Sequence, residues 1–222
     1  MTLRFGLLCF PGVQQLDLTG PYEIFASATN STVHLVWKDF QPVRSATGLM
    51  LMPDTTLADA PDFNVLCIPG GAGVNALLTD ETVLAFIRDK AAKARFVTSV
   101  CTGSLVLGKA GLLAGKRAAT HWNAMDFLPA FGAVPVWERV VRDGSLITAG
   151  GVTSGIDFGL VVVAELLGRE EAETIQLSLE YAPAPPFDAG LPGSAPAAVV
   201  EAAKARMLGS REERKALIDH GS

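Results

Sequence analysis

The chain has 222 residues, of which 49% are hydrophobic, and its formal net charge is −5. This length suits one α/β domain, and this composition excludes an intrinsically disordered chain. The basic residues are scattered except near the C-terminus, so the sequence predicts no nucleic-acid partner, which would require a basic stripe.

The three cysteines, Cys9, Cys67 and Cys101, lie far apart in the sequence. Their number is odd and no metal-ligand spacing such as C-x-x-C is present, so we expect no metal and no cofactor. The N-terminus lacks the small-residue cleavage site of a signal peptide, and no apolar segment approaches the ~20 residues that cross a bilayer. These patterns predict a cytoplasmic protein in a reducing compartment, with no membrane partner.

Strand-like and helix-like segments alternate along the chain. Apolar, β-branched runs predict strands at 3–10, 32–40, 63–70, 94–101 and 145–151. Helical periodicity predicts helices at 20–29, 80–94, 103–111, 122–132 and 155–168, the second of them capped by Asp80. Several strands are continuously apolar, as is typical of parallel strands covered on both faces. The alternation predicts an α/β fold with a doubly wound, mostly parallel sheet and helices on both faces.

Two hairpins and a proline-rich arm interrupt this alternation. The segment 42–57 is expected to turn at Ala46–Gly48, and 134–150 at Asp143–Gly144. Prolines exclude regular structure from 181–196, and a charged helical tail follows. We predict a single domain over 1–222, in which 181–222 form the arm and a C-terminal tail that packs across the domain or a partner.

Cys101 lies where a strand ends and a helix begins, in the segment "FVTSVCTGSLVLGKAG". Ligands of open α/β sheets bind at such strand ends, and a strand–nucleophile–helix turn points its side chain into a cleft. The positive end of the following helix is expected to lower the pKa of the Cys101 thiol. We therefore favour the interpretation of Cys101 as a nucleophile over its interpretation as an inert core cysteine. Cys9 and Cys67 lie inside apolar strands and are interpreted as core residues.

Residues at the other strand ends are candidate partners of Cys101. Asp17 is expected in a loop after the first strand, either as a helix cap or as an acidic partner. Backbone N–H groups near Gly71, Ala72, Gly150 and Val152 are candidates to bind a developing anion. His121 is the possible base of a Cys–His pair, but a hydrogen-bonding role behind the reacting groups is favoured over catalysis.

The segments "DLTGPYEIF", "CIPGGAG", "VCTGSLVLGKAGLLAGKRAATHW" and "ITAGGVTSGIDFGL" together resemble the superfamily that contains the PfpI proteases and the parkinsonism-associated DJ protein. The resemblance covers nearly the whole chain and implies a flavodoxin-like, class I glutamine amidotransferase-like fold. It also implies a homodimer, a Cys101 nucleophile and an acidic partner at Asp17. Thr102 stands where the family protease has histidine, which argues against peptidase activity.

The arm "YAPAPPFDAGLP" and the helical tail extend the resemblance to the isocyanide hydratase branch of that superfamily. This branch implies a lyase whose partners are an isocyanide substrate and water, with a covalent thioimidate on Cys101. Thr102 is expected to bond Asp17 or to position the water. A glyoxalase- or deglycase-like enzyme and a cysteine-oxidation sensor remain alternatives. AraC-type regulators share the motifs, but they carry a further DNA-binding domain of about a hundred residues that 222 residues do not accommodate.

Overall fold

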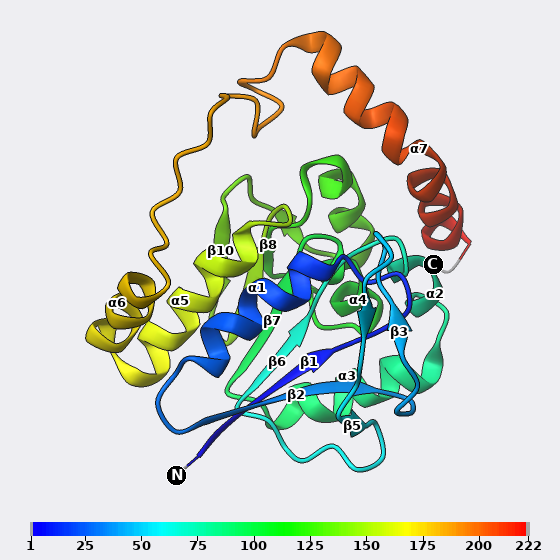
Figure 1. The fold of residues 1–222 in the computed structure, drawn as a ribbon. Helices are drawn as coiled ribbons and strands as arrows, with labels where there is room; N and C mark the ends of the chain where they lie inside the picture. Colours follow the sequence, from blue (N-terminus) through cyan, green and yellow to red (C-terminus); the bar gives the residue numbers. More distant parts are fainter. Residues whose placement is uncertain (1, 221–222) are drawn as a thin grey trace.

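The computed structural model describes residues 2–220, and its centre is a seven-stranded sheet (Figure 1). The strands lie in the order β10-β11-β7-β6-β1-β2-β5, and all neighbours are parallel except β10 and β11. Their bounds are β1 (Leu3–Leu8), β2 (Ser31–Trp37), β5 (Thr55–Thr56), β6 (Val65–Ile68), β7 (Phe96–Val100), β10 (Val140–Asp143) and β11 (Leu146–Ala149). The mostly parallel α/β fold expected from the alternating pattern is confirmed.

Both predicted hairpins are present. Strands β3 (Val43–Arg44) and β4 (Met50–Leu51) form an antiparallel pair around the turn at 46–48. The antiparallel pair β10 and β11 turns at Asp143–Gly144. A further pair, β8 (Arg117–Ala118) with β9 (Val134–Pro135), is parallel and lies outside the main sheet.

Helices cover the sheet on both sides (Figure 1). Helices α1, α5 and α6 pack together as one group, and α2, α3 and α4 as another, with the sheet between them. Their bounds are α1 (Gln15–Ala26), α2 (Val74–Leu77), α3 (Glu81–Lys93), α4 (Gly103–Lys109), the 3-10 helix η1 (Trp122–Phe131), α5 (Ser154–Leu167), α6 (Arg169–Ser178) and α7 (Ala197–Asp219). The predicted cap of α3 is confirmed, because the Asp80 side chain accepts the Val83 N–H at 3.3 Å.

Close packing of α1 against α5 fixes the first of these groups on the sheet. A Cβ atom at Gly155 would lie 3.0 Å from the Pro21 side chain, so the two helix axes approach to a distance that a larger residue would prevent. Behind them the rings of Phe5 and Phe25 stack at 4.4 Å, and Phe158 meets Phe25 edge-on at 5.9 Å. These aromatic contacts join β1, α1 and α5 into one core.

The structure differs from the helical predictions at α1 and α6. Helix α1 begins at Gln15, not near residue 20, so Asp17 lies in its first turn and the expectation of a loop was wrong. Pro21 lies inside α1, where the surrounding packing offsets the hydrogen bond that proline cannot donate. Helix α6 was not anticipated, and the charged tail is one continuous helix, α7, that passes through Gly209.

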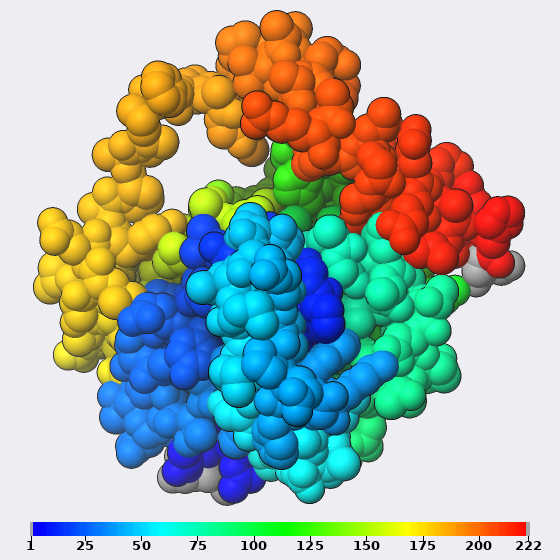
Figure 2. Space-filling view, turned by 45° about the vertical axis from the view of Figure 1, so that its right-hand side comes forward, coloured from blue at the N-terminus to red at the C-terminus, as the bar shows by residue number. Residues whose placement is uncertain are grey.

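The chain between α6 and α7 stands away from the body of the molecule. Residues 181–196 form no regular structure, as expected, and Figure 2 shows an opening between this arm and the surface behind it. The second half of α7 returns to the body, where the helix packs against η1 and α2. The arm therefore brings the last helix to the carboxyl ends of the central strands, next to Cys101.

Candidate active site

Cys101 occupies a strained turn between β7 and α4. Its φ angle is +54°, in the left-handed region that costs an ordinary residue roughly 1–2 kcal/mol. The turn is held from both sides, because the Cys101 N–H donates to the Gly150 carbonyl at 2.8 Å and its carbonyl accepts the Thr120 hydroxyl at 2.9 Å. Such strain at a strand–helix junction is typical of a nucleophile that must project from the sheet.

Asp17 lies against this turn and is fully buried. Its Oδ2 atom accepts the Gly70 N–H at 2.9 Å, while Oδ1 has no hydrogen-bond partner among residues 2–220. Burial raises the Asp17 pKa to about 7, and the Gly70 hydrogen bond and the neighbouring Cys101 thiol only partly oppose this rise. Asp17 can therefore bind and release a proton near neutral pH.

The Cys101 thiol does not have the lowered pKa that its place before a helix predicts. Burial and the Asp17 charge raise its pKa well above the ordinary value, although the N–H and hydroxyl of Thr102 favour the thiolate. The expectation of a lowered thiol pKa was wrong because burial and the neighbouring Asp17 charge outweigh the Thr102 contacts at the start of α4. Two acids this close titrate as a pair, and these pKa directions leave one proton on the pair above about pH 7, with sulfur as its favoured position.

Thr102 bonds to the Gly71 backbone and not to Asp17. Its hydroxyl accepts the Gly71 N–H at 3.1 Å and lies close enough to Cys101 to lower the thiol pKa. This contact corrects the expected Thr102–Asp17 hydrogen bond. It also occupies the Gly71 N–H, which therefore is not free to bind a substrate anion as the sequence suggested.

The other candidate anion donors divide into two groups. Ala72 and Val152 line the cavity above Cys101, and their N–H groups donate no hydrogen bond within the described part of the chain. Gly150 lies behind the cysteine and does not line the cavity, because its N–H donates to Arg139 and its carbonyl accepts from Cys101. The expectation that Gly150 contacts the ligand is therefore not met, whereas Ala72 and Val152 have the predicted position.

His121 also lines the cavity, but as a neutral imidazole. Burial and the charge of Arg214 lower its pKa to about 4. Its Nδ1 accepts the Asn123 N–H at 3.2 Å, which places the ring proton on Nε2. The structure shows no hydrogen bond between His121 and Cys101, so a Cys–His ion pair of the protease kind is not formed.

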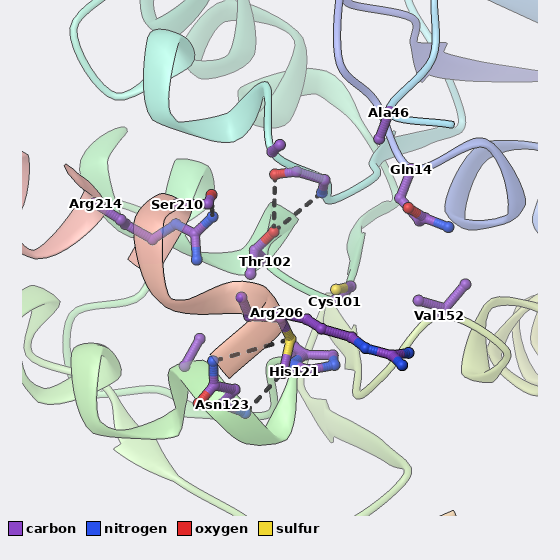
Figure 3. Close-up of a pocket in the computed structure, with 14 residues that line it drawn as sticks. Gln14, Ala46, Cys101, Thr102, His121, Asn123, Val152, Arg206, Ser210 and Arg214 are labelled. Carbon is purple, nitrogen blue, oxygen red and sulfur yellow. Dashed lines mark hydrogen bonds between the residues drawn. The ribbon is translucent and has the colours of Figure 1, made fainter. Parts of the chain in front are cut away.

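The cavity has a volume of about 260 Å³ and its walls come from seven separate parts of the chain (Figure 3). Helix α7 contributes one wall, which the sequence did not indicate because nothing in a charged helix shows which of its residues will be covered. The lining residues are Gln14, Ala46, Gly71, Ala72, Cys101, Thr102, His121, Asn123, Ala124, Val152, Arg206, Met207, Ser210 and Arg214. Gln14, Asn123 and the four α7 residues were missed in the sequence.

The remaining cysteines lie away from this cavity. Cys9 and Cys67 are both fully buried and free, and burial raises the pKa of each thiol to about 12. Within residues 2–220, no three His, Cys, Asp or Glu side chains gather as metal ligands. The same part of the chain contains no helix with the length and apolar character to cross a bilayer.

Comparison with known proteins agrees with this geometry. The isonitrile hydratase of Pseudomonas putida is 58% identical over 222 residues, which are all of this chain and 97% of that protein. The crystal structure of a ThiJ/PfpI family protein from Pseudomonas syringae superposes with a TM-score of 0.95 at 43% identity, over 98% of this chain and 91% of that one.

More distant proteins share the fold or part of the sequence. DJ-1beta of Drosophila melanogaster superposes with a TM-score of 0.76 at 24% identity, over 82% of this chain and all of that one. The transcriptional regulator GbdR of Pseudomonas aeruginosa is 31% identical over 67% of this chain, which is only 41% of the regulator. The profile of the DJ-1/PfpI family matches residues 4–165. The chain therefore belongs to the DJ-1/PfpI family.

Proposed function

We propose that this protein hydrates isocyanides to N-substituted formamides, with Cys101 as the nucleophile and Asp17 as the proton carrier. The observation that carries the proposal is the buried pair of Asp17 and Cys101, of which Cys101 lines a small cavity whose lining contains no Asp or Glu. Full-length similarity to the isonitrile hydratase of Pseudomonas putida supports the substrate class, since isonitrile and isocyanide name the same group. The reaction, addition of water to R–N≡C, makes the protein a lyase.

The first step forms a bond between sulfur and the terminal carbon of the isocyanide. The proton of the pair rests on Cys101, and the reaction begins when that proton moves to Asp17 and leaves Cys101 as the thiolate. As the sulfur attacks, Asp17 gives its proton to the same carbon, and the product is the thioimidate R–N=CH–S–Cys101. Asp17 is now a carboxylate, and no charge has left the site.

The second step consumes water. Asp17 takes a proton from the water as its oxygen adds to the thioimidate carbon, and it passes that proton to the nitrogen. The resulting R–NH–CH(OH)–S–Cys101 collapses when Asp17 takes the hydroxyl proton and the carbon–sulfur bond breaks. This releases R–NH–CHO and restores protonated Asp17 and the Cys101 thiolate.

Neighbouring groups support these steps in distinct ways. Thr102 faces the sulfur with its N–H and hydroxyl, and the Gly71 contact holds that hydroxyl in place. The free N–H groups of Ala72 and Val152 are suited to stabilise negative charge that develops above the sulfur. Neutral His121 is suited to orient the substrate or water with its Nε2–H and not to act as the base.

The test is incubation of the purified protein with a neutral aryl isocyanide, with formamide measured by liquid chromatography. We expect turnover by the wild type and none by Cys101→Ala, while Cys67→Ala serves as a matched control that keeps activity. Asp17→Asn is expected to lose about 10²–10⁴ in rate, because the amide keeps the shape but cannot carry a proton. His121→Asn is expected to lose less.

The same assay distinguishes the alternatives. Turnover of a 2-oxoaldehyde with none of the isocyanide would favour a glyoxalase-like enzyme. Absence of any turnover, with selective oxidation of Cys101 by peroxide, would favour a redox sensor. Near-normal turnover in Asp17→Asn together with an inactive, folded His121→Asn would replace the proposed pair by a Cys–His mechanism.

We also propose that the protein works in the cytoplasm as a homodimer. The arm and the helix before it expose large apolar side chains: Leu177 is 81% exposed, Phe187 80% and Leu191 68%. Side chains of this size gain stability when a second copy covers them. Three free cysteines are consistent with a reducing compartment.

A further inference from the structure

Arg214 is a buried cation without a carboxylate partner. It lies on α7, is 6% exposed, and forms no salt bridge with any described residue. Nε donates to the Asn75 side chain at 2.9 Å and one terminal nitrogen, Nη2, donates to the Ser210 hydroxyl at 3.2 Å. The other, Nη1, donates no hydrogen bond to any of residues 2–220, and Figure 3 shows the guanidinium next to Ser210. A guanidinium removed from water in this way requires a compensating charge nearby.

The contacts of Arg214 orient the guanidinium but do not neutralise it. Asn75 is buried on α2, and its amide nitrogen donates to the Glu213 carboxylate at 2.7 Å and to the Ser210 carbonyl at 3.0 Å. Glu213 is exposed and is separated from Arg214 by the amide of Asn75. Its charge favours the charged form of Arg214, whereas the charge of Arg211 opposes it. Asn75 therefore fixes the direction in which the Arg214 guanidinium points. The remaining positive charge requires a negative charge on the side of the guanidinium that faces the cavity.

The proton-sharing pair supplies that charge. Asp17 on α1, His121 before η1, and Arg206 and Arg214 on α7 are the charged or titratable groups that face Cys101 within the described residues. Asp17 and Cys101 together hold one negative charge, His121 is neutral, and Arg206 is exposed. A charged Cys101 favours the charged form of Arg214, and by reciprocity Arg214 favours the thiolate.

We propose that Arg214 is the counter-charge of the Asp17–Cys101 pair, so that docking of α7 is what makes the buried cysteine a competent nucleophile. Arg214 is a positioning residue, because it acts through the charge on Cys101. It stabilises the thiolate before attack and again when the thiolate leaves the tetrahedral intermediate. This inference deepens the proposed function, but its first test does not depend on isocyanide turnover.

The test is the pH profile of Cys101 alkylation by iodoacetamide in Arg214→Met, Arg214→Lys and the wild type. Methionine fills the same space without charge, a replacement that buried ion pairs often tolerate, so the variant is expected to fold. We expect its profile to move to higher pH by about one unit, which means roughly tenfold slower alkylation at pH 7. Arg214→Lys keeps the charge and should restore most of the rate. Lys215→Gln removes an exposed charge from the neighbouring position of α7 and should leave the profile unchanged.

Each outcome bears on the proposal. An unchanged profile in folded Arg214→Met would overturn it. Equal displacement of the profile in Arg214→Met and Arg214→Lys would also overturn it, since the role would then be geometric. If Arg214→Met does not fold, the Arg214→Gln variant is used with the same criterion. The alkylation profile of Arg214→Met could move to higher pH while the wild type fails to hydrate isocyanides. That result would support the role of Arg214 and would refute only the proposed function.

Discussion

At the scale of single residues, the chemistry of the site depends on two acids that cannot both be ionised. Burial raises the pKa of Asp17 to about 7 and that of Cys101 well above its ordinary value. Each negative charge opposes the other, so the pair loses its first proton near pH 7 and keeps the second well above that pH. The donors around the pair, Gly70 N–H to Asp17 and Thr102 to Cys101, determine how evenly that proton is shared.

Asp17 is expected to lower the stability of the protein as pH rises. Its folded pKa of about 7 lies above the ordinary 3.8, so the native state binds more protons than the unfolded state between these values. The free energy of unfolding should therefore fall between about pH 4 and pH 7, on the order of 2–4 kcal/mol. The free energy of unfolding of Asp17→Asn should vary less with pH over this range, and at pH 8 it should be higher than that of the wild type. Urea unfolding at pH 4.5 and pH 8 checks this, and an equal pH dependence in both proteins would contradict it.

Gly70 is expected to tolerate no side chain. A Cβ atom there would lie 2.6 Å from the Thr102 nitrogen and 2.8 Å from Asp17 Oδ2, so both Thr102 and Asp17 would be displaced. Gly70→Ala should reduce kcat by at least about 10²-fold, since misplacement of reacting groups by about 1 Å has effects of that size. Steady-state kinetics measures this. Gly190→Ala is the matched control, because its Cβ would meet no atom within 4 Å and activity should be unchanged.

At the scale of elements, α7 completes the site although it lies outside the segment that matches the family profile. That profile ends at residue 165, and α7 begins at Ala197. The helix is held on η1 by Arg211, which pairs with the Asp126 carboxylate at 2.6 Å and donates to the Asn123 carbonyl. Loss of this attachment would open the wall of the cavity that contains Met207, Ser210 and Arg214.

Asp126→Ala is expected to loosen α7 without unfolding the sheet. The Arg211 hydrogen bond and charge lower the Asp126 pKa, so the pair is intact at neutral pH and is lost only as pH falls below the ordinary carboxyl range. At pH 7 the amides of 197–219 should exchange with deuterium several-fold faster in the variant, while β6 and β7 keep wild-type protection. Hydrogen exchange with mass spectrometry measures both. Unchanged exchange in α7 would show that other contacts hold the helix.

At the scale of the whole molecule, the arm leaves apolar side chains uncovered. Residues 181–196 lack regular structure and stand away from the surface, as Figure 2 shows. Leu177 at the end of α6 and Phe187 and Leu191 on the arm are large apolar side chains that remain mostly exposed. The cytoplasmic location and the single-domain organisation over 1–222 stay predictions, as does the dimer.

The dimer prediction is tested by sedimentation velocity at micromolar concentration. We expect the mass of two chains for the wild type, because the exposed apolar side chains would be buried between copies. Phe187→Ser should shift the equilibrium toward the monomer by one to two orders of magnitude, as expected when a large apolar contact worth about 1.5–3 kcal/mol is removed. Val161→Ser, at a less exposed apolar position on α5, is the control. A monomeric wild type would refute the prediction.

The sequence by itself determined the architecture and the place of the candidate nucleophile in it. Continuous apolar runs specify buried parallel strands, the alternation with helices specifies their crossovers, and parallel strands necessarily bring their carboxyl ends to one edge. Cys101 therefore had to lie at that edge, and the glycine-rich segment at 69–73 beside it. These inferences rest on local patterns, which a chain carries in its sequence.

Only the tertiary structure decided the charge state of the site and the wall of the cavity that α7 contributes. The pKa of Asp17, Cys101 and His121 depends on how much water packing removes, and that quantity is a property of neighbours from distant segments. The burial of Arg214 also depends on distant segments. In the sequence it is one of several cations in "REERKALIDHG", and it becomes buried only because α7 packs over the ends of the strands. Sequence periodicity shows that a helix forms, but which of its charged residues are buried depends on where the arm positions the helix on the rest of the molecule.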